Sequence, residues 1–133
     1  PGPEFRSQPR IHIDTGSAAS SDMSYTNRAD IYIGDVSSQV YEFLREPRPC
    51  LFLNSHGVAW QDDPNYLHWR AGPVLASADG LLDAIDAAVA SHNDYAHAQE
   101  ALIDATFSRS NRPSVERAAD AITAFLERKA VRG

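Results

Sequence analysis

One segment, residues 29–53, constrains the fold of this chain more than any other. The apolar residues 31–34 lead into a short polar turn, and residues 37–45 then show apolar side chains at helical spacing. Two prolines end this pattern before Cys50–Leu53, which is continuously apolar. A strand, a helix and a second strand within about 25 residues form a βαβ unit, which requires parallel strands and a right-handed crossover.

Weaker patterns predict further elements on both sides of this unit. Alternating apolar and polar residues indicate a strand over residues 11–15, and residues 74–76 are typical of another short strand. A short helix is expected over residues 23–28, capped by Ser21 or Asp22, after a polar loop.

The C-terminal half of the chain is predicted to be helical. One helix is expected after Ser77 or Asp79, a second over residues 93–106, and a third from Pro113 with apolar residues on one face. The order of elements predicts an α/β fold class, a Rossmann-like parallel sheet layered with helices and followed by a helical C-terminus.

Composition limits the kind of protein this is. With 133 residues, 43% of them hydrophobic, the chain can bury one core, and its net charge of −6 argues against a broad nucleic-acid surface. Cys50 is the only cysteine, so no intrachain disulfide forms, and no apolar run approaches the roughly 20 residues of a membrane span. We therefore expect a cytoplasmic protein with no nucleic-acid partner.

The first residues differ from the rest of the sequence. They mix proline, glycine and arginine and have no apolar core of the kind a signal peptide needs. We expect residues 1–10 to be a linker or a cloning remnant, residues 11–130 to form the domain, and the domain to belong to a longer protein.

The turn after residues 31–34 is the best candidate for a ligand site. Ser37 and Ser38 stand where a helix N-terminus offers unpaired backbone N–H groups and a positive dipole end, which suits a diphosphate. A plain helix N-cap is equally typical of serine there. Asp35 is expected to orient the turn, because a carboxylate facing phosphates would repel them.

Short motifs flank this turn in a characteristic order. Ala29-Asp30 precedes the Asp35-Val36-Ser37-Ser38 turn, Glu42-Phe43 follows in the next helix, and Arg48-Pro49 leads into the next apolar strand. In this order they resemble the C-terminal nucleotide-binding domain of a GT-B glycosyltransferase-type enzyme. The resemblance is closest to the CDP-glycerol glycerophosphotransferase (teichoic-acid polymerase-like) family, whose turn reads Asp-Tyr-Ser-Ser.

A second match lies near the end of the chain, where Phe107, a polar loop and Ser114-Val115-Glu116-Arg117 fit the family's closing helix. The resemblance thus covers residues 20–127. This sequence departs from the family at Val36, where the family has tyrosine, and in residues 54–72.

The resemblance implies a function. A nucleotide-diphosphate donor would be the substrate, with no metal or other cofactor, and a glycerol-phosphate or sugar unit would pass to a cell-surface polymer. Ser37 and Ser38 would hold the diphosphate, and Glu42 would bind both ribose hydroxyls. The catalytic base would come from an N-terminal domain outside this sequence, so no catalytic residue is assigned and the isolated chain is expected to be inactive. Any peripheral contact with the inner face of the membrane would also come from that missing part.

Three further residues are candidate contacts to substrate or phosphate. His56, beside Gly57, follows the end of a predicted strand, where α/β sheets bind ligands. Arg70 and Arg117 would suit phosphate, although a solvated or salt-bridged arginine is the more common role for either residue alone. The histidines lack the spacing of a zinc helix, so no metal site is predicted.

Residues 54–72 show no clear period but contain three aromatic residues, Trp60, Tyr66 and Trp69. These residues favour an ordered loop packed on the core, and stacking on a nucleotide base is the functional alternative.

Two other functions stay open. A UDP-GlcNAc 2-epimerase-like enzyme domain shares the broad fold and has a Ser-Gly-Gly turn at the matching position. A non-catalytic α/β interaction module would use the fold without any nucleotide. A Ser-His-Asp hydrolase is excluded because the chain has no Gly-x-Ser-x-Gly elbow.

Overall fold

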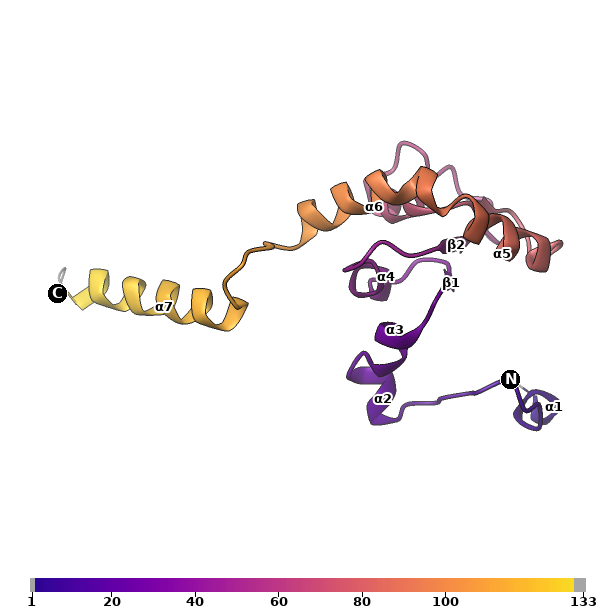
Figure 1. Ribbon diagram of the computed structural model, residues 1–133, viewed down its shortest axis with the longest axis horizontal. Helices are drawn as coiled ribbons and strands as arrows, with labels where there is room; N and C mark the ends of the chain where they lie inside the picture. The colour runs from indigo at the N-terminus through magenta and orange to yellow at the C-terminus, as the bar shows by residue number, and fades with distance from the viewer. Residues whose placement is uncertain (1, 131–133) are drawn as a thin grey trace. The chain divides into compact units, whose positions relative to one another are not determined.

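The computed structural model describes residues 2–130 of a mixed α/β protein, and the chain divides into two compact units, Pro1–Ile103 and Asp104–Gly133. The first unit contains a parallel three-stranded sheet in the order β1-β2-β3 (Figure 1). The strands are β1 (Tyr32–Gly34), β2 (Cys50–Leu53) and β3 (Val74–Leu75). The predicted α/β class and the parallel βαβ unit are therefore confirmed.

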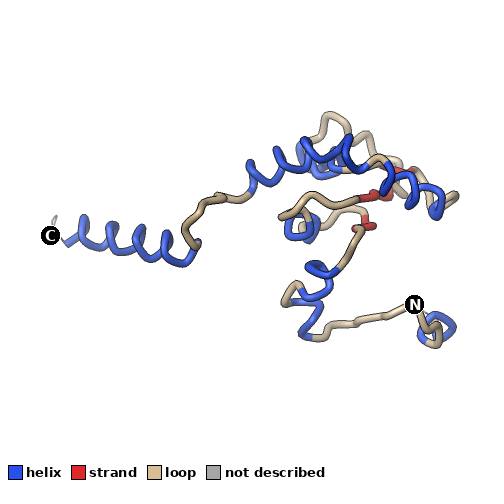
Figure 2. The backbone as a smooth tube through the Cα atoms, viewed as in Figure 1, coloured by secondary structure: helices blue, strands red, loops and turns tan. Residues whose placement is uncertain are grey.

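Short helices precede and connect the strands, and longer helices follow them (Figure 2). In chain order the helices are α1 (Pro3–Arg6), α2 (Ala18–Ser21), α3 (Ser24–Arg28), α4 (Gln39–Phe43), the 3-10 helix η1 (Pro64–Ala71), α5 (Leu81–Ala90), α6 (His92–Thr106) and α7 (Ser114–Ala130). The predicted helices of the C-terminal half are confirmed. None of the helices in residues 2–130 has the length and apolar character needed to cross a membrane.

The strand predicted over residues 11–15 is wrong, because within the described chain these residues pair with no strand. The Asp14 carboxylate instead accepts hydrogen bonds from the backbone N–H groups of Gly16 (2.8 Å) and Ser17 (2.7 Å), which turns the chain. Alternating apolar and polar residues determine which face of a strand would be buried, but they do not show that a partner strand exists.

The helix predicted over residues 37–45 is shorter than expected and covers only Gln39–Phe43. At its end the Arg45 N–H bonds the carbonyl of Glu42 in a tighter turn (3.4 Å), just before the two prolines. At its start the Ser37 hydroxyl accepts from the Gln39 N–H (3.3 Å), so the serine lies outside the helix.

Strand β2 is the centre of the core, because both of its faces are buried. Cys50, Leu51 and Phe52 are each no more than 1% exposed. The ring of Phe52 lies 6.1 Å from that of Tyr32, whose other ring neighbour is Phe43 of α4 at 5.8 Å. Helix α5 packs against β2, and Figure 1 shows α3 and α4 on one side of the strands and α5 on the other. Burial raises the pKa of the Cys50 thiol to about 12.

One buried amide fixes α6 to the sheet. Gln99 is fully buried; its Oε1 accepts from the Arg48 N–H (3.1 Å), and its Nε2 donates to the carbonyls of Arg48 (2.9 Å) and Ala71 (2.7 Å). The backbones entering β2 and β3 touch at the same place, because a Cβ on Gly72 would lie 2.3 Å from the Cys50 carbonyl oxygen. Gln99 therefore joins three segments that are far apart in the sequence.

Arg48 of the Arg-Pro motif links the elements before β2. Its Nη1 donates to the Ala29 carbonyl (2.7 Å), its Nε donates to the Phe43 carbonyl (3.2 Å), and its guanidinium lies 3.9 Å from the centre of the Phe43 ring. This arginine is therefore committed to the fold.

The second unit contains the end of α6 and the whole of α7. Arg112 pairs with Asp120 (2.7 Å) and with Glu116 (3.8 Å), and Arg117 donates to the hydroxyl and carbonyl of Ser108 (2.7 and 2.6 Å). These contacts hold the start of α7. The large apolar residues of its predicted face are exposed by 54–74%: Val115, Ile122, Phe125 and Leu126.

We expect Gln99→Leu to lower the free energy of unfolding by about 3 kcal/mol, since at similar side-chain volume it takes the amide partner away from three buried or part-buried backbone groups. Urea denaturation of the whole chain measures this. The neighbouring Glu100→Leu on the exposed side of α6 is the control and should change stability by less than about 0.5 kcal/mol. Equal effects of the two substitutions would contradict the role given to Gln99.

Candidate functional site

The sheet brings three connecting segments to one edge. Residues 35–38 follow β1, residues 54–57 follow β2 and residues 76–79 follow β3, and the three strands are parallel, so their carboxyl ends meet there. Open α/β sheets bind ligands outside the carboxyl ends of their strands. The candidate site is therefore this edge, with the turn of residues 35–38 at its first strand.

The two serines of the turn have different surroundings. The Ser37 hydroxyl holds the Gln39 N–H and is hydrogen-bonded to the Tyr32 side chain, whose pKa is raised by burial. Ser38 is exposed and makes no side-chain capping bond to α4. Ser37 thus has the capping role that was the structural alternative, and the Ser38 hydroxyl is the one available to a ligand.

Asp35 makes hydrogen bonds within the turn and with segment 54–72. One carboxylate oxygen accepts from the Val36 N–H (2.6 Å), and the Asp35 carbonyl accepts from the indole N–H of Trp69 (2.8 Å). Both the carboxylate and the carbonyl of Asp35 are therefore used in hydrogen bonds that orient the turn.

The aromatic residues of segment 54–72 form a packed cluster. Trp69 is 2% exposed, and its ring centre lies 4.8 Å from that of Tyr66 and 5.8 Å from that of Trp60. The prediction of an ordered loop packed on the core is confirmed, and the buried ring of Trp69 has no free face for a nucleotide base.

His68 is a buried residue that the sequence analysis did not single out. It is 3% exposed, its ring lies 5.7 Å from that of Phe52 and 6.1 Å from that of Tyr41, and its Nε2 has no hydrogen-bond partner among residues 2–130. Burial lowers its pKa, while a hydrogen bond with the Asp35 backbone opposes this change. Its place between Leu67 and Trp69 was the available signal that it belongs to the core.

Glu42 lies at a polar hollow beside α4. Its side chain lines a polar hollow of about 390 Å³ whose other lining residues are Asn27, Arg45, Glu46 and Arg48. The structure therefore brings Glu42 together with α3 and the segment before β2, one helical turn along α4 from Ser38.

The other predicted contacts lie in three places. His56 is exposed in the turn after β2 and therefore lies at the same sheet edge as Ser38. Gly57 closes this turn: its φ is 63°, and its N–H donates to the Asn54 carbonyl (3.1 Å). Arg70 donates to the Gln61 carbonyl (2.8 Å) and braces its loop. Arg117 belongs to the second unit.

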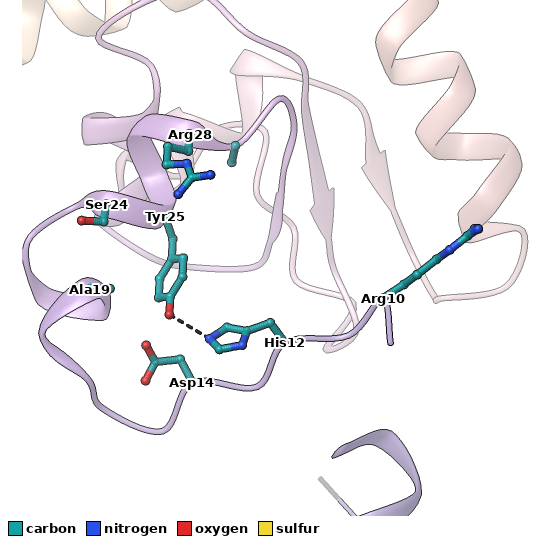
Figure 3. Close-up of a pocket in the computed structure, with 8 residues that line it drawn as sticks. Arg10, His12, Asp14, Ala19, Ser24, Tyr25 and Arg28 are labelled. Carbon is teal, nitrogen blue, oxygen red and sulfur yellow. Dashed lines mark hydrogen bonds between the residues drawn. The ribbon is translucent and has the colours of Figure 1, made fainter. Parts of the chain in front are cut away.

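A further polar cluster joins the segment before α2 to α3 (Figure 3). The Tyr25 hydroxyl lies 2.8 Å from Nε2 of His12, and the Asp14 carboxylate faces the same hydroxyl. Hydrogen bonds from Ser17 hold the pKa of Asp14 well below its usual range. In Figure 3 the Arg10 side chain points away from the other residues that line this hollow.

Comparison with protein-family models, with curated proteins and with solved structures finds no match to this chain. Within residues 2–130 no group of three or more histidine, cysteine or acidic side chains is placed to hold a metal ion. What the chain does is therefore inferred from its residues and topology.

We expect His68 to make the fold less stable in mild acid. Because burial lowers its pKa below the ordinary 6.5, the folded state binds fewer protons, so its contribution is complete above about pH 6.5 and is lost as the pH falls through that value. The free energy of unfolding should fall by at most about 1.4 kcal/mol for each pH unit between about 6.5 and the lowered pKa.

Urea denaturation at several pH values between about 5 and 8 measures this dependence. His68→Phe should remove this part of the slope, whereas His97→Phe, at an exposed histidine, should leave it unchanged. The same slope in all three proteins would show that His68 does not titrate as its burial requires.

Proposed function

We propose that this chain is the donor-binding part of a GT-B type transferase resembling the CDP-glycerol glycerophosphotransferases. In this proposal the turn of residues 35–38 holds the diphosphate of a nucleotide-activated donor. The observation that supports it best is the exposed, uncommitted hydroxyl of Ser38 in a turn at the carboxyl edge of a parallel sheet.

The sheet topology supports the Rossmann-like part of the proposal. Three parallel strands in chain order correspond to one wing of a doubly wound sheet, whose other wing would add strands beyond β1. Among the described residues β1 pairs only with β2, so its other edge is not paired with a strand. A GT-B enzyme would provide them from residues outside this sequence.

The chemistry of the turn supports the ligand. The backbone N–H groups of Ser37 and Ser38 make no hydrogen bond in the described part of the chain, and the Ser38 hydroxyl adds a third donor. Successive free N–H groups in a turn form a concave anion site, and hydrogen bonds to a charged oxygen are stronger than neutral ones. Because α4 has only five residues, the turn rather than a long helix dipole has to supply the binding energy.

The proposed role in the reaction follows from these donors. When the transferred unit leaves, negative charge grows on the departing nucleotide diphosphate, and donors already placed at that charge lower the barrier. Proton abstraction from the acceptor would fall to the part of the enzyme outside this sequence. This chain would then bind the donor without turning it over.

We expect CDP or UDP to shift the backbone amide NMR signals of residues 35–38 and 54–57. Ser38→Ala should weaken binding about thirteenfold, which is about 1.5 kcal/mol and matches the loss of one hydrogen bond to a charged group. Ser21→Ala, at an exposed serine of α2, is the control and should leave the affinity unchanged. No shift with any nucleotide would favour the non-catalytic interaction module, and turnover of UDP-GlcNAc by a protein that contains this chain would favour the epimerase.

A substitution at Glu42 tests whether this chain binds the ribose of the nucleotide. We expect Glu42→Gln to weaken CDP and UDP about fivefold through the loss of a charge-assisted bond, and to leave inorganic pyrophosphate unaffected. Glu46→Gln is the matched control because it changes a carboxylate in the same hollow. Equal weakening of pyrophosphate and nucleotide by Glu42→Gln would rule out the ribose contact.

A further inference from the structure

We propose that Trp69 is a positioning residue for the anion-binding turn, acting through the backbone of Asp35. This inference rests on the proposed function, since it names the residue that aims the donors at the phosphates. It assigns to segment 54–72 a role other than stacking on the nucleotide base.

The first step is the peptide plane between Asp35 and Val36. Its carbonyl accepts from the indole N–H of Trp69 at 2.8 Å, and its N–H donates to the Asp35 carboxylate at 2.6 Å. A peptide group held at both ends cannot rotate, so it sets the direction in which the chain continues. The next two N–H groups along the chain are those of Ser37 and Ser38, which the proposed function aims at the ligand.

The second step is the rigidity of Trp69 itself. Its ring is 2% exposed and is packed against Tyr66 at 4.8 Å and against Phe52 of β2 at 6.4 Å. A side chain enclosed in this way stays in one rotamer, so the indole N–H is a fixed donor. Trp60, at the half-buried margin of the same cluster, has no hydrogen bond from its indole in the described structure.

The third step is the anchoring of η1, which carries Trp69. At its start the Asp63 carboxylate accepts from the Asn65 N–H (2.9 Å), and at its end the Ala71 carbonyl accepts from the buried amide of Gln99 (2.7 Å). Between them η1 is kinked at Tyr66, where φ is −111° and ψ is 17°. Both ends of η1 are therefore fixed.

As a consequence, the turn of residues 35–38 is preorganised before the ligand binds. A free turn would lose conformational entropy on binding, and that loss would reduce the affinity. Removing the Trp69 N–H leaves the ring packing in place and takes away one of the two side-chain partners of the Asp35 backbone, so that only His68 still holds it. The effect should therefore reach the Ser37 and Ser38 amides first.

The test replaces the indole at position 69 with its benzothiophene analogue, which keeps the ring shape and lacks the N–H, and makes the same replacement at Trp60 as the matched control. In the chain without ligand, amide shifts and hydrogen exchange should change at residues 35–38 for the analogue at position 69 and not for the control. The indole N–H of Trp69 should also exchange more slowly than that of Trp60.

The second measurement is the affinity for inorganic pyrophosphate and for CDP. The analogue at position 69 should weaken both about tenfold, which corresponds to about 1.4 kcal/mol, and the control should weaken neither. Trp69→Phe, which also lacks the N–H, should give the same pattern in the turn together with a loss of stability from the smaller ring.

Unchanged amides at residues 35–38 in the analogue would overturn the inference, as would changes spread over β2 and α6, which would mean a general loss of packing. If the unaltered chain binds neither pyrophosphate nor CDP, the proposed function fails, and the amide measurement on the free chain still decides the role of Trp69.

Discussion

The buried side chain of Gln99 is the contact on which the arrangement of this unit depends. Its amide satisfies the backbone of Arg48 before β2 and of Ala71 at the end of η1, so one residue of α6 fixes both segments. Since η1 carries Trp69, and Trp69 holds the carbonyl of Asp35, a continuous chain of hydrogen bonds and packed rings runs from α6 to the turn after β1. The candidate site at the carboxyl ends of the strands is therefore supported by contacts made just before β2 and β3 begin.

The local parts of the fold could be predicted from the sequence. The apolar run of β2 and the helical spacing in α5 and α7 identify those elements, because periodicity and prolines act within a few residues. The strand expected over residues 11–15 failed because a strand needs a partner, and pairing is a property of distant residues. For the same reason, no pattern shows that Gln99 bonds a segment 51 residues away or that Trp69 bonds one 34 residues away.

The candidate site was predictable to a similar extent. The position of the turn could be predicted from the strand and helix around it. The different roles of Ser37 and Ser38 could not, because they depend on which hydroxyl contacts Gln39 and Tyr32. His68 was not recognised either. Its sequence neighbours suggest burial, but only the fold places its ring between β2 and α4 and beneath the backbone of Asp35.

The burial of Cys50 has a practical meaning. Its thiol is 1% exposed in the central strand, and burial also raises its pKa, so it reacts slowly with alkylating reagents while β2 stays in the sheet. Since the sequence has no other cysteine, the rate at which such a reagent labels the protein counts the openings of its central strand. Local unfolding of β2 can therefore be followed at a cysteine that the sequence already contains.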